Sequence, residues 1–174
     1  MKISQKLLLV VGVLALVAVA SGCRGPGTFN MYSKISVLDF QVSPQIQGRV
    51  APITLDQLKE TSTRWIQATG RFPQVLQGAG NDPQTVYVQG TIHAYRQHRI
   101  GKAVVTAFTG VDIRGESLID YRFFDAAGRT LAFQRVHARY RRAAPGMDPT
   151  AEEAGYQLSR VVAWHKDPYP PAPQ

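Results

Sequence analysis

The segment "TVYVQGTIHAYR", residues 85–96, constrains the fold more than any other part of the chain. From Val86 to Ala94 every second residue is apolar or small, and the residues between are polar or aromatic. Because side chains of a β-strand alternate between its two faces, this pattern predicts a strand. Gly90 within it indicates a bulge or the close approach of another element.

A second alternation predicts a β-hairpin over residues 117–142. Ile119, Tyr121 and Phe123 alternate with other residues, and "DAAG" at 125–128 can form the turn. The apolar pattern then resumes in the stretch that contains Leu131 and Phe133.

Further strands are predicted in two shorter apolar runs. Residues 35–42, in "KISVLDFQV", are typical of a first, central strand that is buried on both faces. Residues 72–76 are predicted to form a short strand or a strand-like return.

Two helices are predicted from their start signals and apolar stripes. The first begins at a capping box formed by Thr54 and Gln57, ends near Thr69, and carries Trp65 as a core residue. The second begins at the Asp148–Pro149 cap. The expected fold class is α/β (α+β): a mixed sheet of four to five strands, with two main helices packed on it and a cleaved signal helix before it.

The amino terminus has the features of a secretory signal peptide. Lys2 and Lys6 precede an apolar stretch, residues 7–20. A helix of that length rises only about 21 Å, which is too short to remain as a stable span.

The residues that follow, Ala20-Ser21-Gly22-Cys23, resemble the lipobox of bacterial lipoproteins. The resemblance implies cleavage between Gly22 and Cys23 and a covalent lipid on Cys23, with no other cofactor. Arg24, in place of a retention Asp, implies an outer-membrane lipoprotein that faces the periplasm, with the inner membrane as the alternative. An ordinary signal peptide with an incidental cysteine is the other interpretation.

The expected organisation is therefore a signal peptide (1–22), a lipidated Cys with a flexible tether (23–34), one globular domain (35–166) and a Pro-rich disordered tail (167–174). Cys23 is the only cysteine, so no internal disulfide can form. Without Lys2 and Lys6, eighteen of twenty Lys and Arg residues remain against twelve Asp and Glu, a formal charge of +6. That excess favours anionic lipid, cell-wall polymer or an acidic protein face, and nucleic acid is not expected at this location.

No pattern indicates catalysis, so we expect the chain not to be an enzyme. The four histidines, at 93, 98, 137 and 165, lack the spacing of metal ligands. There is no Gly-x-Ser-x-Gly motif, and the cysteine is assigned to lipid. The carboxylate pairs Asp112 with Glu116 and Asp120 with Asp125 are more typical of solvated or capping residues.

A basic row is the candidate binding feature. It consists of Arg135, His137, Arg139 and Arg141 at every second position of one strand, with Arg142 next to it. Guanidinium groups bind phosphates and carboxylates strongly, so the row is a candidate site for an anion or a partner. The alternative is an exposed or edge strand that charge protects from aggregation.

Much of the chain resembles a family of bacterial lipoproteins that is catalogued as a domain of unknown function. The segments that carry the resemblance are "YSKISVLDF" (32–40), "TGRFPQVLQG" (69–78), "VYVQGTIHAY" (86–95), Gly101 to Gly115, and "LIDYRFFDAAGRTLA" (118–132).

The first strand, helix and return also look distantly like the TolB amino-terminal domain, the curli-secretion lipoprotein and lipoproteins that activate penicillin-binding proteins. These resemblances imply an assembly, regulatory or partner-docking role in the envelope. A binding module for anionic envelope polymer or lipid is the alternative.

Overall fold

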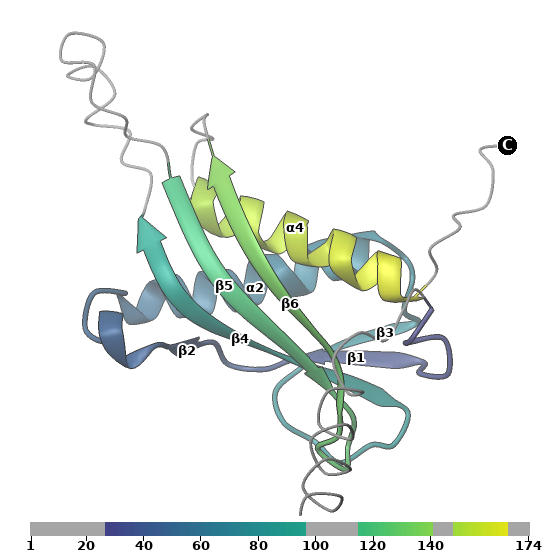
Figure 1. Cartoon of the computed structure of the whole chain (residues 1–174). Coiled ribbons are helices and arrows are strands. Elements are labelled where there is room, and N and C mark those ends of the chain that lie inside the picture. The colour runs from purple at the N-terminus through teal and green to yellow at the C-terminus, as the bar shows by residue number, and fades with distance from the viewer. Residues whose placement is uncertain (1–26, 97–114, 141–147, 167–174) are drawn as a thin grey trace, which may run out of the picture.

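A computed structural model describes residues 27–96, 115–140 and 148–166 (Figure 1). They form an α+β fold in which two helices pack on one face of a six-stranded mixed sheet, as the sequence predicts for the fold class. The strands are β1 (Lys34–Val37), β2 (Gln41–Val42), β3 (Gln74–Gln77), β4 (Thr85–Arg96), β5 (Gly115–Phe124) and β6 (Thr130–Tyr140). The helices are α2 (Pro52–Ala68), α4 (Pro149–Lys166) and the short 3-10 helix η1 (Pro44–Ile46).

The strand order is β3-β1-β4-β5-β6, with β2 also paired to β4. β1 lies parallel to both β3 and β4, and α2 supplies the crossover that a parallel β1–β3 pair requires. β4, β5 and β6 are antiparallel, so the predicted hairpin is confirmed.

The predicted number of four to five strands is too low, because the run at residues 35–42 forms two strands. Val37 is opposite Val88 and Gln41 is opposite Thr91. The three residues 38–40 between β1 and β2 therefore lie across from only two residues of β4, 89 and 90. A Cβ atom on Gly90 would lie 2.5 Å from Cε1 of Phe40. Phe40 therefore occupies the space that a side chain at position 90 would fill, and close approach is the reason for glycine there.

The core lies between the sheet and the two helices. Val86, Val88 and Ile92 of β4 point into it and are fully buried, as the alternation predicts. For Ala94 the prediction is wrong, because the register shifts after Ile92 and puts Ala94 opposite Leu118, on the other face of the sheet. Leu58 and Ile66 of α2 and Leu158 and Val162 of α4 cover them from the helix side.

The two helices touch through backbone at Gly155. A Cβ atom there would lie 2.9 Å from the carbonyl carbon of Thr61 and 3.0 Å from the amide nitrogen of Ser62. The Thr61 hydroxyl donates a hydrogen bond to the carbonyl oxygen of Ala151, at 3.1 Å. No larger side chain fits between helices this close.

Of the two predicted helix starts, the first is wrong and the second is confirmed. α2 begins at Pro52, after Ala51, so Thr54 lies inside its first turn and the capping box with Gln57 is wrong. Proline suits the first helical position, where its missing N–H costs nothing. The Asp148 cap of α4 is confirmed, because its Oδ1 accepts a hydrogen bond from the Thr150 amide at 2.9 Å.

Trp65 lies at the rim of the helix pair and not inside the core. The side chain is half-buried, and its Nε1 donates to Glu152 of α4 at 2.9 Å. The indole ring meets the ring of Tyr156 edge-on, with centroids 5.2 Å apart. Trp65 therefore joins α2 to α4.

The folded domain begins earlier than predicted. Phe29 and Tyr32 are buried, and the Phe29 amide donates to the carbonyl oxygen of His165, at 2.9 Å. The Lys166 ammonium donates to three carbonyl oxygens of the same segment, those of Phe29 (3.2 Å), Asn30 (3.3 Å) and Tyr32. Residues 27–34, assigned above to a tether, thus belong to the domain.

Several sequence predictions concern residues outside the described ranges. These are the signal peptide with Gly22 and Cys23, the tail at 167–174, and residues 101–114 of the segment from Gly101 to Gly115 that carries part of the family resemblance. Among the helices that the structure describes, none combines the length and apolar character needed to cross a membrane.

Gly155→Ala tests the helix contact. We expect it to lower the free energy of unfolding by about 1–3 kcal/mol, because the added methyl group meets backbone that cannot move aside. Urea denaturation measures the loss. Arg160→Ala, at an exposed position of the same helix, should change stability by less than about 0.5 kcal/mol. Equal stability of Gly155→Ala and the wild type would contradict the close contact.

Candidate functional site

The face of the sheet opposite the helices is the candidate functional surface. Figure 1 shows α2 and α4 together on one side of the strands, and neither helix covers the other side. We call this surface the open face. Its residues are Gln89, Thr91 and His93 of β4, Glu116, Leu118, Asp120 and Arg122 of β5, and Phe133, Arg135, His137 and Arg139 of β6.

The structure brings three residues of the predicted basic row together on the open face. Arg135, His137 and Arg139 are exposed there, while Val136 and Ala138 between them point to the helices and are buried. β6 is also an edge strand of the described sheet, as the alternative interpretation required. Arg141 and Arg142 lie outside the described residues.

Asp120 neutralises the first member of the row. Its two carboxylate oxygens accept hydrogen bonds from Nε and Nη2 of Arg135, at 2.6 and 2.7 Å. On the other side, Nε2 of His93 lies 3.0 Å from Oδ2. The carboxylate is buried, and the hydrogen bonds from Arg135 hold the pKa of Asp120 below its ordinary value.

Glu116 pairs with the other two members. Nε2 of His137 lies 2.5 Å from its Oε1 and donates to it, since a carboxylate only accepts. Nη2 of Arg139 lies 3.6 Å from the same oxygen. The hydrogen bond from His137, followed by the charges of Arg139 and Arg96, lowers the pKa of Glu116.

Sequence reasoning missed both acids as parts of this site. From the sequence, Asp120 and Glu116 were considered only as members of carboxylate pairs, with Asp125 and Asp112 respectively. In the structure Asp120 pairs with Arg135, and Asp125 with its own neighbour Arg129. The antiparallel register of the predicted hairpin was the available signal, because it sets Asp120 opposite Arg135 and Glu116 opposite Arg139.

Arg122 is bound by neutral groups instead. Its Nε donates to the Thr130 hydroxyl at 3.0 Å, and its Nη2 donates to the Gly128 carbonyl at 3.1 Å. The guanidinium carbon lies 5.2 Å from the centre of the Phe124 ring. Of the arginines on the open face, it therefore has the least compensated charge.

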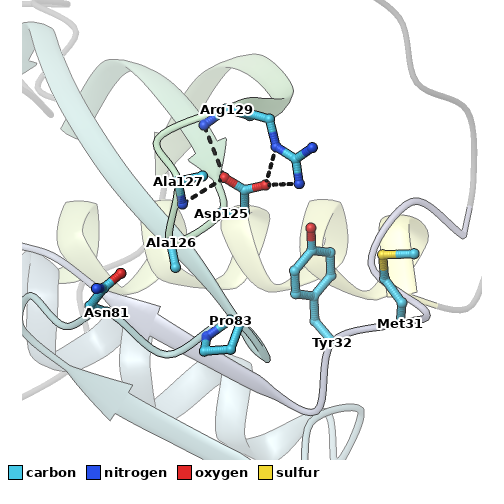
Figure 2. Close-up of a pocket in the computed structure, with 8 residues that line it drawn as sticks. All are labelled: Met31, Tyr32, Asn81, Pro83, Asp125, Ala126, Ala127 and Arg129. Atoms are coloured by element: carbon cyan, nitrogen blue, oxygen red, sulfur yellow. Dashed lines mark hydrogen bonds and ion pairs between the residues drawn. The ribbon is translucent and has the colours of Figure 1, made fainter.

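A hollow of about 470 Å³ at one end of the sheet is a second candidate (Figure 2). It lies between Met31 and Tyr32, the loop before β4, and the turn between β5 and β6. The Asp125 carboxylate at its rim already accepts from the amides of Ala127 and Arg129, both at 3.0 Å, and from the Arg129 side chain at 2.7 Å. This carboxylate holds the turn and is not free for a ligand.

Histidines and acids do not gather into a metal centre in the part of the chain that the structure describes. His165 is buried, with its ring 4.9 Å from that of Phe29 and 6.0 Å from that of Phe123. His98 and Asp112 lie outside the described residues. The open face thus remains the principal candidate.

Comparison with known proteins shows the fold alone. The sequence matches no family profile, and no curated protein matches it. Its structure is similar to two structures of PelC dodecamers from Paraburkholderia phytofirmans, each 12% identical in sequence. One has a TM-score of 0.56 over 83% of this chain and 94% of that chain. The other, a point variant, has 0.54 over 86% and 95%. A Xanthomonas campestris protein of the DUF330 family, 8% identical, has 0.47 over 83% and 87%.

The Asp120–Arg135 pair makes stability depend on pH. The folded-state pKa of Asp120 lies below the ordinary 3.8, so its ionised form stabilises the fold above about pH 4, and this stabilisation is lost as the pH falls through the folded-state value. We therefore expect Asp120→Asn to lower the melting temperature at pH 7 by a few degrees, and by less as the pH approaches 3.

Asp39→Asn is the matched control, because the Asp39 carboxylate is exposed in its pair with Lys59 and such pairs contribute little. Circular dichroism melts of both variants between pH 3 and 7 provide the measurement. If Asp120→Asn melted at the same temperature as the wild type at pH 7, or if the difference in melting temperature grew in acid, the stabilising role of the Asp120–Arg135 pair would be contradicted.

Proposed function

We propose that this chain is a non-enzymatic, lipid-anchored protein of the bacterial envelope that docks on a protein partner through the open face. The lipid anchor rests on the signal peptide and Cys23, and the docking role rests on the open face. The outer membrane, with the domain in the periplasm, is the proposed location.

The observation that carries the docking role is the pairing of charges on the open face. Arg135 already gives the edge formed by Nε and Nη2 to Asp120, so most of its charge is compensated and only the outer edge of the guanidinium is left for another anion. Fixed charges of both signs instead suit a complementary protein surface, where they determine register and specificity. Phe133 is 54% exposed among them and provides an apolar contact.

The alternative, a binding module for anionic polymer or lipid, rests on less of this surface. Two observations support it: no carboxylate neutralises Arg122 in the described contacts, and the chain without its signal peptide has a formal charge of +6. Contacts made through such charges weaken steeply with ionic strength. Binding to cell-wall sacculi or anionic vesicles that salt and Arg122→Ala both abolish would favour this alternative.

A second copy of the chain is the first partner to test. The PelC proteins of similar fold, 12% identical in sequence, are dodecamers, which motivates an experiment on assembly. β3 and β6 are the two edges of the described sheet, so head-to-tail contacts between copies are geometrically available.

A photocrosslinking amino acid in place of Phe133 tests the docking role in the native host. We expect an adduct whose mass corresponds either to two copies of the chain or to the chain with one identified envelope protein, and which survives high salt. The same amino acid in place of Arg160, exposed on α4, is the control. No adduct at position 133, or equal yields at both positions, would contradict docking through the open face.

Cys23→Ser tests the anchor. Without the thiol, no thioether to diacylglycerol can form, so we expect complete loss of lipid labelling and of membrane fractionation, with the signal peptide retained. Radioactive palmitate labelling and mass spectrometry of the amino terminus measure both. A variant that is still labelled would refute the lipidation of Cys23.

A further inference from the structure

The packed part of the chain begins very close to the proposed anchor. The Asn30 amide donates to the carbonyl of Gly27 at 3.1 Å, and Phe29 is fully buried. Only four residue steps separate Gly27 from Cys23, and an extended chain spans roughly 14 Å over four steps. A lipid on Cys23 would therefore keep the start of the domain next to the head groups.

The same end of the molecule carries exposed apolar side chains. Met31 is 80% exposed and follows Phe29 by two residues. Trp164, 55% exposed, precedes His165, whose carbonyl accepts the Phe29 amide. Figure 1 shows the carboxyl end of α4 beside the start of β1.

We propose that this end of the domain, with Met31 and Trp164, lies on the lipid surface and inserts these two side chains at the head-group level. The inference rests on the proposed lipid anchor. Tryptophan prefers this zone because its large ring is apolar and its N–H can still bond to water or head groups. Stable attachment comes from the acyl chains, so the two side chains determine orientation.

The rest of the described structure is compatible with this orientation. Lys166 is turned inward, onto the carbonyls of residues 29–32, and its ammonium lies 4.8 Å from the centre of the Phe72 ring. The turn at 125–128 borders the hollow beside Met31 (Figure 2). In Figure 1, α2 begins at the side of the molecule opposite the carboxyl end of α4, so the exposed Ile53, the second residue of α2, is remote from the proposed lipid contact.

The chain has two tryptophans, so each can be isolated for a fluorescence test. Trp65→Phe leaves Trp164, and Trp164→Phe leaves the half-buried Trp65 as the matched reference. Both lipidated proteins are reconstituted into vesicles of phosphatidylethanolamine and phosphatidylglycerol that contain brominated phospholipid. We expect the bromine atoms to quench the fluorescence of Trp164 at least twofold more than that of Trp65. We also expect aqueous iodide to quench Trp164 less in the vesicle-bound protein than in unlipidated protein without detergent.

Two further variants, made in the Trp65→Phe background, test the orientation. Met31→Ser should reduce the quenching of Trp164 by brominated lipid. Ile53→Ser, which removes another exposed apolar side chain at the far side of the molecule, should leave the quenching unchanged. Circular dichroism verifies that each variant is folded.

The outcomes separate this inference from the proposed function. Lipid on Cys23, found by mass spectrometry, together with a Trp164 that brominated lipid does not quench would overturn only the membrane contact. If neither brominated lipid nor iodide quenched Trp164, the membrane contact would also be overturned, because a second copy of the chain would then cover this end. Absence of lipid on Cys23 would overturn the anchor and the membrane contact together.

Discussion

The backbone contact between α2 and α4 at Gly155 is the constraint on which the other features depend. Two helices that approach this closely form one layer, and this layer packs on a single face of the sheet. The other face is left to the alternate side chains of β4, β5 and β6. Its polar character follows, because a surface facing water favours charged and hydrogen-bonding groups. Core packing and the candidate docking surface are thus two consequences of one arrangement.

Most of the fold could be predicted from periodicity, and the failures occurred where a distant contact decides. The strand at 85–96, the hairpin and the Asp148 cap are local patterns, and all were confirmed. Phe29 lies in a Gly-rich stretch without any pattern and is buried because the last turn of α4 and Phe123 of β5 both pack against it. The capping box failed for a different reason: Pro52 offered an earlier start.

Only the basic residues of the candidate site could be predicted from the sequence. Alternation alone places Arg135, His137 and Arg139 on one face. Whether that face is positive or neutral depends on the residues across the strand pair, and these follow only from the register that the turn at 125–128 imposes. Asp120 and Glu116 occupy those positions, so a row that looks like an anion clamp contains two ion pairs, Asp120 with Arg135 and Glu116 with Arg139.

The bonds of Lys166 have a mechanical consequence. They join the first turn of the described chain to its last helix, although more than 130 residues separate the bonded groups along the sequence. Tension applied at residue 27 would therefore pass into this junction with α4, and also into β5, because the ring of Phe29 packs against that of Phe123 with centroids 5.1 Å apart. The load would be shared between the helix layer and the sheet.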